Sequence, residues 1–210
     1  MSGILDLLNS DLGKQIISGV SNDTNQSQSK TSDVMSMALP LLMGAMKKNA
    51  TTPEGAEGLM NALNTKHDGS ILDNLGSLFE GGVDNSVKQD GAGILKHVLG
   101  NSENNITNAI SQKSGLDSDA VMNILKVAAP LVLGYLGKQK QQQQVQSSSG
   151  IEGLLGGILG GDNKQQSMIE SLLDGDNDGS ILDDLAGMAL GNSKGKGSEL
   201  GDLLGGFFGK

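Results

Sequence analysis

The chain contains no cysteine and no arginine, and each absence excludes a class of function. Without cysteine there can be no disulfide, no thiolate nucleophile and no thiolate metal ligand. Without arginine, and with a net charge of −9, the chain lacks a basic stripe for phosphate groups, so we expect no nucleic-acid binding. Anionic membrane surfaces are disfavoured for the same reason.

Aromatic residues are scarce as well: Phe79, Tyr135, Phe207 and Phe208 are all the chain has. Aliphatic and methionine side chains must therefore form the core, which they do most naturally on helices, whereas a β-sandwich usually contains more Val, Thr, Tyr and Phe. We accordingly expect an all-α fold, with a compact multi-helix domain. No apolar run approaches the roughly 20 residues of a membrane span. The N-terminus also lacks the basic and apolar regions of a secretory signal, so the expected location is the cytoplasm.

Helix start signals recur along the chain. Thr52 precedes Pro53, a favourable N-cap followed by proline at the first helical position. Ser102, and Asp117 or Ser118, are further candidate caps. The apolar spacing between these signals predicts helices near 3–19, 33–48, 53–63, 70–80, 88–99, 102–113 and 118–138.

Two apolar segments repeat each other. "ALPLLMGAMKKN" (38–49) aligns with "AAPLVLGYLGKQ" (128–139), with Pro, Leu, Gly and Lys in register. Each lies in a strongly apolar helical run, which predicts two buried central helices kinked at Pro40 and Pro130. We expect these helices to pack against each other, and a ligand groove at the paired kinks is the alternative.

A second repeat marks the domain organisation: "HDGSILDNL" (67–75) recurs as "NDGSILDDL" (177–185). The Gln/Ser-rich segment between them has too few apolar residues to fold and is typical of a flexible linker. A small, Gly-rich helical appendage is expected after it. The predicted parts are a helical body at 1–140, a linker at 141–150, a turn-helix unit with an acidic loop at 151–192, and a flexible Gly-rich tail at 193–210.

The acidic loop of the second copy follows most of an EF-hand pattern. Candidate calcium ligands are Asp174, Asp176, Asp178, the carbonyl of Ser180, and Asp184. The bidentate glutamate that normally closes such a loop is replaced by Leu185, so any affinity should be weak.

A capped turn explains the same residues without a metal ion. Asp178-Gly179 is a turn dipeptide, Ser180 would cap a helix, and Asp183 would complete a capping box. The first copy has Lys66 where the second has Asp176, so the turn and cap are what the copies share. Both interpretations stay open.

Other chemistry has little support in the sequence. His67 and His97 lie far apart, and zinc would need more ligands, so a structural or solvent-facing role is expected for each. No nucleophile elbow or P-loop occurs. We therefore expect no enzyme and no cofactor, calcium excepted. The methionines predict core filling, with an adaptable partner groove as the alternative; they include Met35, Met37, Met43, Met46 and Met122.

The combination "GILDLL", "ALPLLMGAM", "HDGSILDNL", "GAGILKHVLG", "SGLDSDAV" and "AAPLVLGYLGK" resembles a bacterial family of unknown function, DUF937. The likeness covers most of residues 1–140, and a distant similarity to YidB-like proteins accompanies it. The resemblance implies an all-helical fold and carries no catalytic residues.

These observations favour a non-enzymatic interaction or scaffold protein. Its apolar tail would contact other copies or a protein partner. A weak calcium-binding protein and an enzyme of a type not visible in the sequence are the alternatives.

Overall fold

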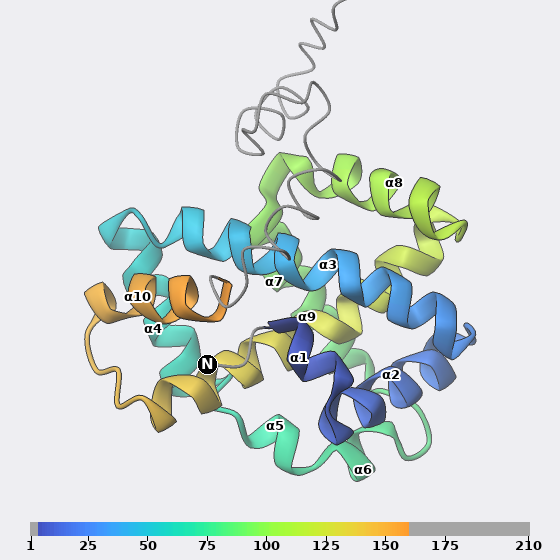
Figure 1. Cartoon of the computed structure of the whole chain (residues 1–210), viewed down its shortest axis with the longest axis horizontal. Helices are drawn as coiled ribbons and strands as arrows, with labels where there is room; N and C mark the ends of the chain where they lie inside the picture. Colours follow the sequence, from blue (N-terminus) through green and yellow to red (C-terminus); the bar gives the residue numbers. More distant parts are fainter. Residues whose placement is uncertain (1–3, 160–210) are drawn as a thin grey trace, which may run out of the picture. The chain divides into compact units, whose positions relative to one another are not determined.

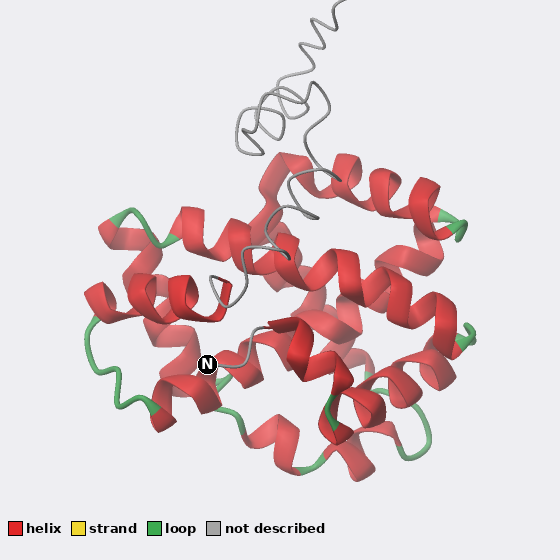
Figure 2. Cartoon of the chain, viewed as in Figure 1, coloured by secondary structure: helices red, strands yellow, loops and turns green. Residues whose placement is uncertain are grey.

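The computed structural model describes residues 4–159, and every regular element within them is helical (Figure 2). This confirms the all-α prediction. The helices are α1 (Ile4–Asn9), α2 (Asp11–Thr24), α3 (Gln28–Asn49), α4 (Pro53–Thr65), α5 (Ser70–Asp73), α6 (Leu75–Phe79), α7 (Asn85–Leu99), the short 3-10 helix η1 (Gly100–Ser102), α8 (Glu103–Ser114), α9 (Ser118–Gln142) and α10 (Ser148–Leu159).

Helix α9 is the centre of the core. It packs against α2, α3, α4, α5, α7, α8 and α10. Its middle section is buried on all sides, with Val121, Ile124, Val127, Ala128, Ala129 and Leu136 wholly inaccessible to solvent. Its Leu, Ile and Val side chains therefore contribute about 1.5–3 kcal/mol each by leaving water, and the other helices are arranged around it.

The two repeated proline-containing segments lie on α3 and α9, and these helices contact each other. The expectation that they pack together is therefore confirmed. Pro40 and Pro130 both lie inside their helices and are both buried. Figure 1 shows α3 crossing the body beside the central helix.

Helices α7 and α9 approach each other closely because one residue in the contact has no side chain. A Cβ at Gly91 would lie 1.7 Å from the carbonyl oxygen of Lys126. Glycine normally weakens a helix interior by about 1 kcal/mol relative to alanine. At this position the loss is offset by the close packing of the two backbones.

Two predicted helices are each divided in the structure. The first ends at Asn9, because Ser10 adopts an extended conformation and caps α2 by accepting a hydrogen bond from the Gly13 amide at 3.1 Å. Helix α1 then packs on α2 so closely that a Cβ at Gly13 would lie 2.0 Å from the Leu7 carbonyl oxygen. The predicted helix 70–80 is divided at Asn74, whose φ of −124° and ψ of 31° are not helical.

The predicted caps are partly confirmed. Thr52 accepts from the Gly55 amide at 3.1 Å, and Asp117 accepts from the Ala120 amide at 2.7 Å. Ser102 makes no side-chain cap, because η1 already leads into α8 with helical backbone angles at that residue, so this prediction is wrong. Ser27, which was not among the predicted caps, caps α3 by accepting a hydrogen bond from the Lys30 amide at 3.2 Å.

Helix α10 differs from the predicted domain boundaries. Its residues fall in the segments expected to be a linker and a separate appendage, yet α10 packs on α3 and α4 (Figure 1). Ile151, Leu154, Leu155 and Ile158 are all at most 3% exposed. The apolar side chains recur at helical spacing, and their burial outweighs the low helix propensity of the glycines between them. The predicted tail at 193–210 lies outside the described residues.

Helix α9 bears on the expectation that no segment could span a membrane. Among residues 4–159 it is one helix of sufficient length and apolar composition to do so. Of its most apolar 18-residue stretch, 78% is buried inside the body. A buried core helix has the same length and composition, so this finding carries no assignment to a membrane.

We predict opposite effects from alanine at two glycines of α7. Gly91→Ala should lower the free energy of unfolding by about 1–3 kcal/mol, because its Cβ overlaps the Lys126 carbonyl. Gly93→Ala should raise it by up to about 1 kcal/mol, because a Cβ there meets no described atom within 4 Å. Urea unfolding measures both, and equal effects would contradict the close α7–α9 contact.

We also predict that α10 is part of the core. Leu155→Ala should destabilise the protein by about 2–5 kcal/mol, since Leu155 is wholly buried. Glu152→Ala, at an exposed position of the same helix, is the matched control and should change stability by less than about 0.5 kcal/mol. If the Leu155→Ala protein is as stable as the control, α10 does not belong to the core and the expected separate appendage is the better description.

Candidate functional site

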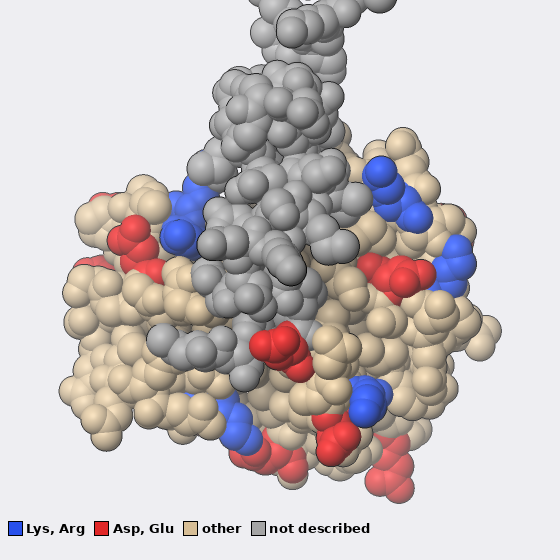
Figure 3. All heavy atoms as spheres, viewed as in Figure 1, with Lys and Arg blue, Asp and Glu red and all other residues tan. Residues whose placement is uncertain are grey.

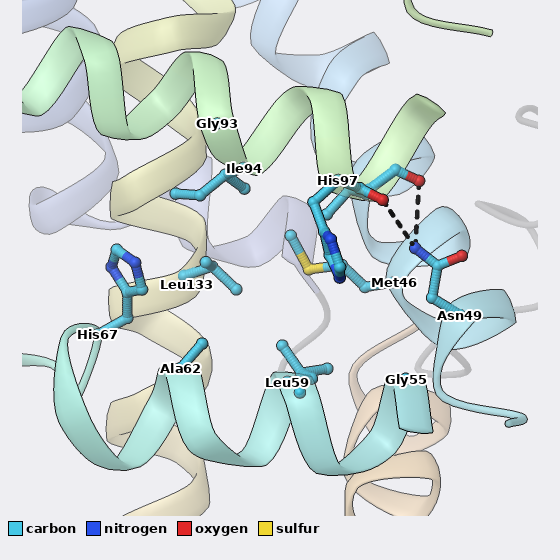
Figure 4. Close-up of a pocket in the computed structure, with 12 residues that line it drawn as sticks. Met46, Asn49, Gly55, Leu59, Ala62, His67, Gly93, Ile94, His97 and Leu133 are labelled. Carbon is cyan, nitrogen blue, oxygen red and sulfur yellow. Dashed lines mark hydrogen bonds between the residues drawn. The ribbon is translucent and has the colours of Figure 1, made fainter. Parts of the chain in front are cut away.

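The described body contains an apolar pocket between α4 and α7, with a volume of about 200 Å³ (Figure 4). Leu59 and Ala62 come from α4, and Ile94 and Val98 come from α7. Met46 of α3 and Leu133 of α9 complete the apolar lining. The volume exceeds that of a 150 Å³ cavity known to hold benzene, so one ring or one large side chain would fit.

Two glycines keep the pocket open. Gly58 on α4 and Gly93 on α7 line it, and a Cβ at either residue would meet no described atom within 4 Å. Close backbone packing therefore does not explain them, in contrast to Gly91. The missing side chains leave the walls of the pocket accessible to solvent.

His67 reaches the pocket because its turn is held against the end of α9 (Figure 4). A Cβ at Gly137 would lie 2.0 Å from the His67 carbonyl oxygen, so the turn rests directly on the α9 backbone. Gln141 donates a hydrogen bond to the Asp68 carbonyl at 2.8 Å, and Lys138 pairs with Asp73 at 2.7 Å.

The turn itself has a simple chemical basis. Gly69 has a φ of 109°, which side chains rarely tolerate, and the Asp68 carboxylate accepts a hydrogen bond from the Ser70 amide at 3.0 Å. Hydrogen bonds from the Ser70 amide and hydroxyl hold the pKa of Asp68 below its usual value. The acidic side chain before the glycine, rather than the serine after it, therefore satisfies the backbone at the start of α5.

His67 is buried, and its pKa lies below the usual value. Its Nε2 lies 3.5 Å from Asp90 Oδ2, and Lys66 Nζ pairs with Asp90 Oδ1 at 2.6 Å. Burial lowers the pKa of His67, and this effect outweighs the opposing attraction of Asp90. Lys66 lowers the pKa further, whereas Asp68 raises it.

The second imidazole, His97, lies on the exposed part of the pocket wall. Its backbone is fixed from α3, because the Asn49 side-chain amide donates to the carbonyl oxygens of Val98 at 3.3 Å and His97 at 3.5 Å (Figure 4). The two histidines are 30 positions apart in sequence, and no motif indicated that they line the same pocket. No group of three or more His, Asp or Glu side chains that could hold a metal occurs among the described residues.

The structure bears on several predicted features. Neither Pro40 nor Pro130 lines the pocket, so it is not a groove at paired kinks. Met35, Met43 and Met46 are buried in the core, as core filling predicts, and Met46 also borders the pocket, whereas Met37 and Met122 are half-buried. The candidate calcium ligands lie outside the described residues; they are Asp174, Asp176, Asp178, Ser180 and Asp184.

The described residues form an all-helical body with a small apolar pocket at its surface. A family model described as "Bacterial protein of unknown function (DUF937)" matches residues 6–139, and the chain belongs to this family. No curated protein and no solved structure matches the chain. The likeness to YidB-like proteins is not confirmed by these comparisons.

We predict that His67 makes stability depend on pH. Because its folded pKa lies below the unfolded value, the unfolded chain binds a proton first, and stability is lost as the pH falls below about 6.5. His67→Gln should lose less stability than the wild type between pH 7.5 and 5.5. Thermal unfolding at both pH values measures this, and parallel losses would show that His67 does not titrate in this way.

Proposed function

We propose that this protein is a non-enzymatic scaffold that associates with further copies of itself through its C-terminal region. The observation that carries the proposal is that the body has a core of its own, which four buried aliphatic side chains of α10 complete. The chain continues for 51 more residues and includes Leu203, Leu204, Phe207 and Phe208. These groups gain free energy at about 25 cal/mol per Å² by burial, and a second molecule can supply the surface.

The surface of the body is compatible with this role. On the face in Figure 3, acidic and basic side chains are scattered among uncharged ones, and no basic stripe is visible outside the grey atoms. Such a surface supports a protein partner over a polyanion, because phosphate binding requires clustered cations. The pocket between α4 and α7 adds a recess for one apolar group.

Truncation tests the proposal. The full chain should form dimers or larger assemblies at micromolar to millimolar concentration, and deletion of residues 196–210 should raise the dissociation constant at least about tenfold, since it removes two of the four aromatic residues. Sedimentation equilibrium with light scattering measures both. A matched variant with only Lys194→Ala and Lys196→Ala retains the apolar groups and should associate like the wild type.

The proposal fails in one clear case. If the full chain and the truncated chain are both monomers across this range, the C-terminal region does not act as a self-association element.

A calcium-binding role for the acidic loop is the second candidate, supported by three carboxylates within five residues. The first copy shows that the Asp before Gly-Ser already accepts a backbone amide, which favours the turn as the shared role. Calorimetry with several millimolar calcium separates the two candidates. Heat that disappears in Asp176→Ala would support calcium, whereas no heat would leave the capped turn alone.

A further inference from the structure

The first Asp-Gly-Ser-Ile-Leu-Asp unit, residues 68–73, docks on a specific place of α9. The side chain of Ile71 lies over Gly134, where its Cγ2 would be 2.5 Å from an added Cβ. About one turn further along the same face of α9, Lys138 Nζ pairs with Asp73 Oδ1 at 2.7 Å. One glycine and one lysine four residues apart therefore form the seat of the unit.

Helix α3 repeats this seat through the internal sequence repeat. The alignment of 38–49 with 128–139 places Gly44 at the position of Gly134 and Lys48 at the position of Lys138. Gly44 is half-buried and Lys48 is exposed. A Cβ at Gly44 would meet no described atom within 4 Å, so no part of residues 4–159 fills the seat on α3.

The unit that occupies the seat on α9 is residues 68–73, and the chain carries a second copy of it. In "DGSILD" at 178–183, Ile181 corresponds to Ile71 and Asp183 to Asp73. The charges are complementary, because the second unit has Asp183 and Asp184, and the seat on α3 has Lys48 with Lys47 beside it. Both lysine side chains are exposed and accessible to a partner.

We propose that residues 178–183 of a second copy dock on α3 at Gly44 and Lys48, in the way that residues 68–73 dock on α9. The inference rests on the proposed self-association and adds a second contact to the one expected of residues 196–210. Ile181 would lie over Gly44, and Asp183 would pair with Lys48. The two seats differ where the first turn rests: Lys47 stands in place of Gly137, so the second turn would sit further from its helix.

This contact joins unlike surfaces of two molecules. Each copy presents one unit and one seat, so the arrangement is head-to-tail, and copies add until a ring closes or a filament forms. Two copies that occupy each other's seats close as a dimer, and any other geometry adds further copies, so dimers or larger assemblies are expected at high concentration.

A disulfide experiment tests the contact directly, because the chain has no cysteine of its own. Full-length Gly44→Cys and full-length Ile181→Cys are mixed under mild oxidation. The proposal expects a mixed disulfide between them, since the equivalent atoms on α9 are within a few ångströms. Gly153→Cys, at an exposed and open position of α10, replaces Gly44→Cys as the control and should give little product.

Association of the full chain gives an independent readout. Gly44→Leu should raise the dissociation constant at least about tenfold by filling the seat, whereas Gly153→Leu should leave it unchanged. Lys48→Asp and Asp183→Lys should each weaken association roughly two- to fivefold, and the combined variant should recover it. Unfolding midpoints equal to or above the wild type for Gly44→Leu would show that the body is intact.

The outcomes separate this inference from the proposed function. Self-association that is unaffected by Gly44→Leu, with no mixed disulfide, overturns the docking site and leaves the scaffold role standing. A disulfide that forms only within one chain of the Gly44→Cys, Ile181→Cys double variant overturns the second copy as occupant. Monomers at all concentrations, with no mixed disulfide, overturn both.

Discussion

Close backbone contact with α9 is the constraint on which the rest of the body depends. At Gly91 the α7 backbone lies against Lys126, and at Gly137 the turn of residues 67–69 lies against α9 itself. No side chain larger than hydrogen fits at either point. Because the backbones approach so closely at these points, α9 can be surrounded by helices on several sides. Aliphatic side chains fill the space that aromatic rings would otherwise occupy.

The same constraint creates the pocket. Since the turn of residues 67–69 is fixed on α9, His67 enters the body at the end of α4, where burial lowers its pKa. On the opposite wall, α7 is fixed by Gly91, which leaves Gly93 facing the cavity. Two glycines on one helix, two residues apart, therefore have opposite roles: one permits contact and the other leaves space.

Much of the fold could be predicted from the sequence because the signals were local. Helical spacing, the Thr52 and Asp117 caps and the paired apolar repeats indicated the helices and their central pair. The division at Ser10 was not predicted, because it depends on α1 folding back at Gly13. Helix α10 was assigned to an appendage since its glycines lower helix propensity, and its burial on α3 and α4 is a tertiary effect. The pocket combines four helices, and no spacing rule brings His67 and His97 together.

The internal repeats acquire a physical meaning when the structure is compared with the sequence. The first turn unit is one copy of one repeat, and the α9 segment is one copy of the other. These two copies contact each other, because Ile71 lies on Gly134 and Asp73 pairs with Lys138. A second contact of the same kind can form only if the second turn unit and the second helix segment both keep the residues that make the first contact. Gly44 and Lys48 preserve the helix half, and Ile181 and Asp183 preserve the turn half, whereas Lys47 in place of Gly137 relaxes the tightest point. A looser second contact would be weaker than the first, and a weak contact between copies would suit the proposed assembly, which would form and dissociate with concentration.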